Sequence, residues 1–169
     1  FVDPDNRRPV DFKRNSKILT ELAQQEARSQ YLLVQRILKS WQDGRVKLYV
    51  TYKALNIRRA YRDLFEHGDY IPLQVHGEKR EHIFAFARIR RENWILTVVP
   101  RLLTELITVG DLPFGQGVWK DDKLLLPNDA PECWLNVLTE ENVRVLGGGK
   151  QLSLSDIFNV FPVALLKSI

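Results

Sequence analysis

The sequence predicts an α+β protein, with helices in residues 1–67 and an all-β antiparallel sandwich in residues 68–169. Three observations favour this class. Apolar residues recur at helical spacing through the first part of the chain. That periodicity stops at residues 67–73, and the remaining residues form short apolar runs separated by turn-forming residues, as in a sandwich of short strands.

Composition is that of an ordinary globular protein, with 169 residues, 44% hydrophobic and 27% charged. The chain has no methionine and begins at Phe1, so we expect it to be a piece of a longer protein. Its one cysteine, Cys133, rules out an internal disulfide and is typical of a reducing compartment. Since no run approaches the roughly 18 apolar residues of a membrane span, we expect a soluble, cytoplasmic protein with no membrane partner.

Charge is distributed unevenly along the chain. Residues 1–67 hold 14 Lys and Arg against 8 Asp and Glu, whereas residues 68–169 hold 11 against 13. A basic half raises the hypothesis of nucleic-acid binding. The basic residues are dispersed, however, and lack the interleaved aromatic residues of a stacking platform. We therefore rank nucleic-acid binding last and expect no nucleic-acid partner.

Two helices are expected first. One begins after Asp11, which can act as its N-cap, and runs to about Glu26; the second runs from about Ser29 to Gln42, with Gly44 at its C-terminal stop. The residues expected to face the core in these helices are Phe12, Asn15, Ile18, Leu19, Leu22, Tyr31, Val34, Ile37, Leu38 and Trp41.

The third segment, Arg45 to Glu66, has two readings. Its first residues alternate with a period of two, which on its own predicts a strand. A helical face is also present, and no proline or glycine interrupts the segment. The simpler interpretation is one long helix with a broken tail near residues 60–65.

In the β half, residues 82–89 are apolar on both faces, as in a central sandwich strand, and residues 94–99 are expected to form their hairpin partner. Residues 141–146 and 150–154 are interpreted as the two strands of a hairpin joined through Gly147 to Gly149. Ser155 is expected to cap a helical turn over 156–160. Residues 101–117 give no clear pattern beyond a short helix and an irregular loop.

The opening loop, Val2 to Asp11, concentrates polar groups in a stiff segment. Two prolines remove backbone donors and fix φ, and ten residues hold three carboxylates, one amide and two adjacent guanidiniums. Such a loop either braces itself through ion pairs or presents its guanidiniums to a ligand. Both readings stay open from the residues alone.

The run from Asp3 to Asp11, Asp-Pro-Asp-Asn-Arg-Arg-Pro-Val-Asp, resembles the segment after the eighth barrel strand in the maltooligosyl trehalose synthases, within the α-amylase superfamily of glycoside hydrolases. Trp41 to Leu48 is similar to a stretch in the helical wrapping of their barrel. Shorter similarities follow in order, including Gly68-Asp69-Tyr70 and Val99-Pro100-Arg101-Leu102.

This resemblance implies a fold, an activity and site residues. Residues 1–67 would be the end of a (β/α)₈ barrel, and residues 68–169 the C-terminal domain of the amylase type. The activity would convert the reducing-end α-1,4 bond of a maltooligosaccharide to an α,α-1,1 bond, without metal or cofactor. The nucleophile and acid would lie on earlier strands, so the fragment alone is predicted inactive. Substrate-binding or positioning roles are expected for Asp3, Asp5, Asn6, Arg7, Arg8 and Lys47.

Other chemistry-bearing residues favour structural roles. The pairs Asp121-Asp122 and Glu140-Glu141 are interpreted as solvated turn residues, and the histidines lack metal-ligand spacing. Of the four tryptophans, only Trp119 is left open for stacking on a sugar ring. A non-catalytic carbohydrate-binding module is the main alternative function, and it requires an exposed aromatic platform.

Overall fold

The computed structural model describes residues 9–147 and 149–169. The chain divides between Ile57 and Arg58 into two compact units, which we call the helical unit and the β unit. The coarse prediction of helices followed by antiparallel sheet is confirmed.

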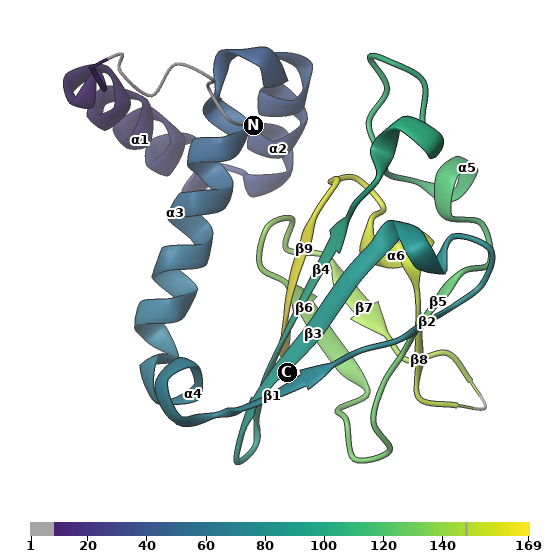
Figure 1. Ribbon diagram of the computed structural model, residues 1–169. Coiled ribbons are helices and arrows are strands. Elements are labelled where there is room, and N and C mark those ends of the chain that lie inside the picture. Colours follow the sequence, from purple (N-terminus) through teal and green to yellow (C-terminus); the bar gives the residue numbers. More distant parts are fainter. Residues whose placement is uncertain (1–8, 148) are drawn as a thin grey trace. The chain divides into compact units, whose positions relative to one another are not determined.

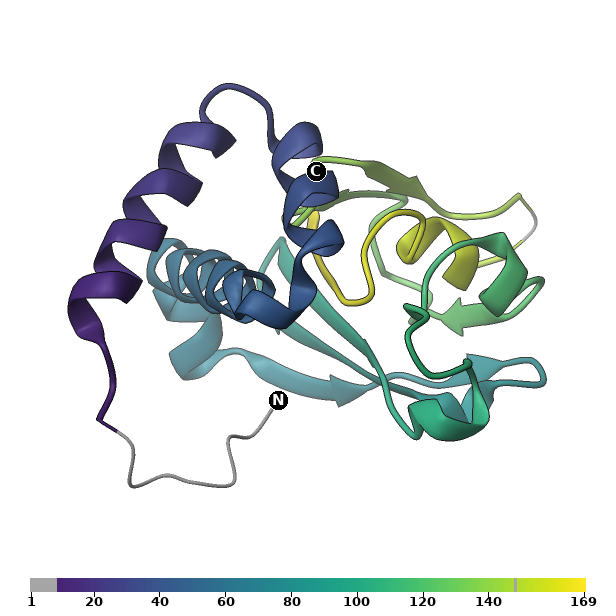
Figure 2. The same ribbon diagram turned by 90° about the horizontal axis from the view of Figure 1, so that it is seen from above.

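The helical unit contains the two predicted helices and most of a third. Its elements are α1 (Phe12–Glu26), α2 (Gln30–Lys39), the 3-10 helix η1 (Trp41–Asp43) and α3 (Arg45–Ala60) (Figure 1). Asp11 and Ser29 accept hydrogen bonds from backbone amides in the first turns of α1 and α2, as N-caps do. Gly44 takes the left-handed conformation, with φ of 83°, that ends η1. Figure 2 shows α1 and α2 joined by their short turn.

The core of the helical unit differs in part from the predicted apolar face. Its buried hydrophobic side chains are Ile18, Leu22, Leu33, Val34, Ile37, Val46 and Tyr49. Phe12 is 77% exposed and Tyr31 is 51% exposed, so their prediction as core residues is wrong. Phe12 is the first residue of α1, whose buried residues are Ile18 and Leu22, and Tyr31 precedes the buried residues Leu33 and Val34 of α2.

The long third helix and its broken tail are confirmed. α3 ends at Ala60, Tyr61 leaves the helical conformation with φ of −110° and ψ of 42°, and α4 (Arg62–His67) follows. The period-two pattern at the start of α3 therefore does not reflect a strand. Tyr49 and Val46 are its buried residues, three apart on one helical face.

The β unit contains two antiparallel sheets. The first has six strands in the order β1 (Asp69–Pro72), β3 (Ile83–Arg90), β4 (Asn93–Pro100), β9 (Ala164–Ser168), β6 (Cys133–Asn136) and β7 (Asn142–Arg144). The second has three strands in the order β2 (Val75–His76), β5 (Lys123–Leu125) and β8 (Gln151–Ser153). Short helical segments between them are η2 (Arg80–His82), η3 (Leu103–Glu105), α5 (Gln116–Trp119) and α6 (Leu154–Ile157).

Side chains from both sheets share one hydrophobic core. Trp94 and Trp134 from the larger sheet meet edge to face, with ring centroids 6.4 Å apart. Leu124 and Leu152 from the smaller sheet belong to the same cluster. The predicted hairpin of residues 82–89 with 94–99 is confirmed, and it turns through Arg91 and Glu92 between β3 and β4.

Two local predictions in the β unit are wrong. β7 and β8 do not form a hairpin, because β7 pairs with β6 and β8 pairs with β5 in the other sheet. The N-cap of α6 is Ser153, whose hydroxyl accepts from the Asp156 amide, whereas the predicted cap Ser155 is buried inside the helical turn. β3 lies between β1 and β4, as predicted for a central strand, although Phe84 on its outer face is 48% exposed.

Candidate functional site

Most of the predicted site lies outside the described residues: Asp3, Asp5, Asn6, Arg7 and Arg8. The first described residue is Pro9, and α1 begins three residues later at Phe12. The Asp11 carboxylate accepts a hydrogen bond of 2.8 Å from the Arg14 amide. In sequence, the predicted loop is therefore followed at once by a helix start whose backbone is fixed by a side-chain cap.

Lys47, the remaining predicted residue, is an exposed side chain on the first turns of α3. Two residues before it, Arg45 forms ion pairs with Asp43 at 3.0 Å and with Glu21 of α1 at 3.2 Å. These contacts hold the start of α3 against α1 within the helical unit. They fix the backbone around Lys47, and its role toward a substrate stays a prediction.

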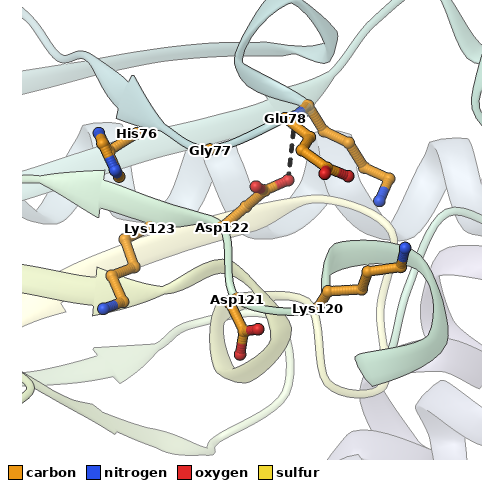
Figure 3. A pocket seen from close by; sticks show the side chains of 8 residues that line it. His76, Gly77, Glu78, Lys120, Asp121, Asp122 and Lys123 are labelled. Carbon is orange, nitrogen blue, oxygen red and sulfur yellow. Dashed lines mark hydrogen bonds between the residues drawn. The ribbon is translucent and has the colours of Figure 1, made fainter.

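A pocket of about 370 Å³ in the β unit gathers charged residues from two turns (Figure 3). It is lined by His76, Gly77, Glu78, Lys79, Lys120, Asp121, Asp122 and Lys123. The first four residues run from β2 toward η2, and the others lead from α5 into β5. Three lysines and three carboxylates line the pocket, so their formal charges cancel.

Asp122 is the buried member of this pocket, with 5% of its surface exposed. Its Oδ2 accepts a hydrogen bond of 3.2 Å from the Lys79 amide. A Cβ on Gly77, where φ is 140°, would collide with Oδ1. The Asp122 backbone also accepts from the Leu154 amide and donates to the Trp119 carbonyl. One residue thus joins three chain segments.

The two neighbouring aspartates have different roles. Figure 3 shows Asp122 pointing toward the turn at Gly77 and Glu78, whereas Asp121 points away from it. Asp121 is exposed, as expected of a solvated turn residue, but the same prediction for Asp122 is wrong. Because its carboxylate is committed to a backbone amide, we assign Asp122 a structural role.

In the second acidic pair, Glu140-Glu141, one residue is again exposed and the other is hydrogen-bonded within the protein. Glu140 is exposed, with φ of 62°. Glu141 is half-buried, so its prediction as a solvated residue is wrong; its Oε1 accepts a hydrogen bond of 2.6 Å from Asn159. Within the described chain its Oε2 is buried with no hydrogen-bond partner. We see no geometry here that prepares two carboxyl groups to act together on a glycosidic bond.

A second polar pocket, of about 290 Å³, was not found by sequence reasoning. It lies within the β unit between the start of α4 and the β3–β4 turn, and is lined by Ala60, Tyr61, Arg62, Asp63, Leu64, Arg90, Arg91 and Asn93. Asp63 forms an ion pair with Arg90 at 3.2 Å, and its Oδ1 lies 3.3 Å from Nδ1 of His67. The hydrogen bond from Arg90 lowers the pKa of Asp63, which keeps this carboxylate ionised.

Trp119 is not available for stacking on a sugar. It is fully buried, its indole N–H donates to the Pro113 carbonyl at 2.9 Å, and its ring lies 5.1 Å from that of Phe158. The hypothesis that left Trp119 open is therefore wrong. Trp94 and Trp134 are core residues, as predicted.

Within residues 9–147 and 149–169, no group of three or more His, Cys, Asp and Glu side chains is placed to hold a metal ion. The imidazole of His67 pairs with Asp63, and His82 Nδ1 lies 3.2 Å from the Leu102 carbonyl oxygen. None of the described helices has the length and apolarity needed to cross a bilayer.

Comparison with known proteins gives a consistent result. No protein-family model matches the chain. A putative maltooligosyl trehalose synthase of Mycobacterium tuberculosis, present in two strains, is 32% identical over 125 residues, which are 72% of this chain. The solved structure of a mutant maltooligosyltrehalose synthase from Arthrobacter ramosus matches 98% of the chain, with 26% identity and a TM-score of 0.62.

The chain is homologous to part of maltooligosyl trehalose synthase. The match spans 13% of the length of the curated synthases and 18% of the solved synthase chain. A partial, C-terminal region of such a synthase fits these comparisons. The match to the solved synthase covers nearly all of this chain, so it includes both the helical unit and the β unit.

Proposed function

We propose that this chain is the C-terminal portion of an enzyme that rearranges the reducing end of maltooligosaccharides. The reaction converts the terminal α-1,4 bond to an α,α-1,1 bond by intramolecular transglucosylation, the isomerisation that begins trehalose biosynthesis. The observation that carries the proposal is the match of nearly the whole chain to a solved maltooligosyltrehalose synthase at 26% identity. The 32% identity to the curated synthases supports it independently.

Within this proposal, residues 1–67 are the end of the catalytic (β/α)₈ barrel, including the loop after the eighth strand. Residues 68–169 are the C-terminal β-sandwich domain. The helices α1 to α4 before residue 68 and the two antiparallel sheets after it support this division, while the compact β unit itself begins ten residues earlier, at Arg58. The remainder of the barrel is then the chain's first partner, a maltooligosaccharide its substrate, and the cytoplasm its location.

The catalytic carboxyl groups belong to the absent part of the barrel. Retention at the anomeric carbon needs two carboxyl groups about 5–5.5 Å apart, one as nucleophile and one as acid. Asp122 and Glu141 are held by backbone or side-chain donors in the β unit, and they are not free for either role. The fragment by itself is therefore expected to be inactive.

The contribution of this chain is to position the sugar that leaves and returns. The glucose released from the reducing end must turn and attack the glycosyl-enzyme before water does. The site therefore has to hold that glucose and exclude solvent. Guanidinium groups offer fixed, paired donors to hydroxyls or carboxylates. We assign this role to the loop residues Asp3, Asp5, Asn6, Arg7 and Arg8, with Lys47 as a further substrate contact.

The test is product analysis with the full-length protein that contains this chain, which we call the parent. Incubated with maltopentaose, the parent should remove the reducing end while the number of glucose units in the oligosaccharide is unchanged. The isolated chain should leave the substrate intact. Hydrolysis to shorter maltooligosaccharides, with every product still reducing, would contradict the proposal and indicate an ordinary amylase.

A further inference from the structure

The pocket between the start of α4 and the β3–β4 turn is rich in guanidinium groups. Arg62, Arg90 and Arg91 line this space of about 290 Å³, which we call the arginine pocket, and Asp63 supplies its one lining carboxylate. The lining therefore carries two more positive than negative formal charges. A cleft with a surplus of one sign of charge concentrates ions of the opposite sign. The surplus favours an anionic ligand.

Contacts between α4 and β3 hold the walls of the arginine pocket in place. The guanidinium of Arg88 donates to the Phe65 carbonyl at 2.8 Å. A Cβ on Gly68 would collide with the carbonyl oxygens of Leu64 and Ile89, so the glycine lets the end of α4 approach the end of β3 closely. The folded β unit thus forms the pocket before a ligand arrives, as most small-molecule sites are formed.

The guanidinium groups in the pocket have donors left over for a ligand. Arg90 uses its Nε–H for Asp63, and Arg62 uses its Nε–H for Glu66. A guanidinium has five N–H donors, so the terminal nitrogens of both arginines are still available. Among the residues that the structure describes, the Arg91 side chain has no hydrogen bond or ion pair at all.

Arg91 is also held in an unfavourable backbone conformation. It is the first of the two residues that join β3 to β4, and its φ is 55°, a value that favours glycine. Residues in such conformations cluster at ligand-binding sites. The Arg91 charge acts on the pocket, because it lowers the pKa of Asp63 after the larger effects of the Arg90 hydrogen bond and charge and the charge of His67.

We propose that the arginine pocket binds a phosphate dianion, either as the free ion or as the phosphate group of a small ester. Planar guanidiniums pair with phosphate oxygens through two parallel hydrogen bonds. The surplus of positive charge in the lining matches the charge of the dianion. The inference does not depend on the proposed function, since the pocket lies within the β unit and contains none of the residues assigned to the sugar.

Isothermal titration calorimetry of the parent with inorganic phosphate tests the site, at constant ionic strength and about pH 8, where phosphate is a dianion. One phosphate should bind per chain. Arg91→Gln should weaken binding at least about ten-fold, because charge-assisted hydrogen bonds are lost. Arg144→Gln, at an exposed arginine of β7, is the matched control and should leave the Kd unchanged.

Two further variants separate binding from folding and from general charge. Arg91→Gly should melt no lower than the unmodified protein, since glycine favours positive φ, and should still lose phosphate binding. Glu66→Gln releases Arg62 from its ion pair and should tighten binding. Asp129→Asn removes an exposed carboxylate outside the pocket and should not.

Glucose 6-phosphate identifies the source of the phosphate. Tighter binding of this ester than of inorganic phosphate would show that the pocket also holds the rest of the ester. Equal affinity would show that the pocket recognises the phosphate group alone. Both results support the inference.

Three results would overturn it. The first is a parent that binds no phosphate, and the second is equal weakening by Arg91→Gln and Arg144→Gln, which would indicate diffuse charge attraction. The third is acetate binding as tight as phosphate binding, which would indicate a carboxylate site. The products formed from maltopentaose test the proposed function separately, so a failure of one claim leaves the other standing.

Discussion

The backbone amide of Lys79 donates a hydrogen bond to Oδ2 of Asp122, 3.2 Å away and 43 residues later in the chain. This contact joins the turn after β2 to the turn before β5. Both turns belong to the smaller sheet, whose strand β2 is only two residues long. A strand of two residues has few ladder hydrogen bonds. The buried Asp122 carboxylate adds a hydrogen bond that helps to hold the turn after β2 in the smaller sheet.

Asp122→Ala should lower the free energy of unfolding by about 1–3 kcal/mol, because it leaves the Lys79 amide without its charged acceptor. The matched control is Asp121→Ala, at the exposed neighbour, which should change it by less than about 0.5 kcal/mol. Urea unfolding followed by tryptophan fluorescence measures both. Similar losses for the two variants would refute the structural role of Asp122.

Arg90→Gln should raise the pKa of Asp63, since the hydrogen bond from Arg90 is the largest cause of its lowered value. Arg91→Gln, which removes only a weaker charge interaction, should raise it less. A lowered folded-state pKa stabilises the fold above the unfolded pKa of Asp, and this contribution is lost as pH falls through the folded value. Carbon-detected NMR titration of the Asp63 carboxyl distinguishes the two variants; equal shifts would contradict the assignment.

Trp119→Ala should cost about 3–5 kcal/mol of stability, the usual loss for a large buried aromatic side chain. Trp119→Phe should cost less, because it keeps the packing against Phe158 and loses the hydrogen bond to Pro113. Thermal unfolding of both variants measures this order. A fully stable Trp119→Ala protein with weakened glucan binding would instead restore Trp119 as a sugar contact.

Lys53→Met should destabilise the helical unit by about 1–3 kcal/mol. Lys53 forms a partly buried ion pair with Glu26, donates to Gln30 at 3.0 Å and lies over the Tyr49 ring. Its loss leaves the Glu26 carboxylate without this cation. Lys39→Met on the exposed side of α2 is the control and should be nearly neutral. Hydrogen exchange of α1 and α3 amides reports on this unit; equal protection in both variants would contradict the prediction.

The helices could be predicted because their signals are local. Caps at Asp11 and Ser29, the glycine stop at Gly44 and an unbroken helical run up to Tyr61 are all readable within a few residues. The pairing of β7 and β8 with different sheets could not be predicted in this way. Their partners β6 and β5 are chosen by the shared core, and a glycine run permits a crossover as readily as a hairpin.

Candidate site residues could be predicted from the sequence only where they belong to a recognisable sequence motif. The Asp-Pro-Asp-Asn-Arg-Arg-Pro run pointed to the loop before α1, whose residues lie outside the described chain. Nothing local separates Asp122 from Asp121, because the distinction arises from Lys79 and Gly77, more than 40 residues earlier. The pocket at Asp63 likewise needs the β3–β4 turn, which reaches α4 only in the folded β unit.

We propose that the arginines of the opening loop help to retain the displaced glucose. The most direct test is the ratio of free glucose to trehalosyl product formed by the parent carrying Arg7→Ala, with Arg144→Ala on the exposed side of β7 as the control. We expect Arg7→Ala to release more glucose per trehalosyl product, whereas Arg144→Ala should keep the unmodified ratio. An unchanged ratio and unchanged activity in Arg7→Ala would contradict it.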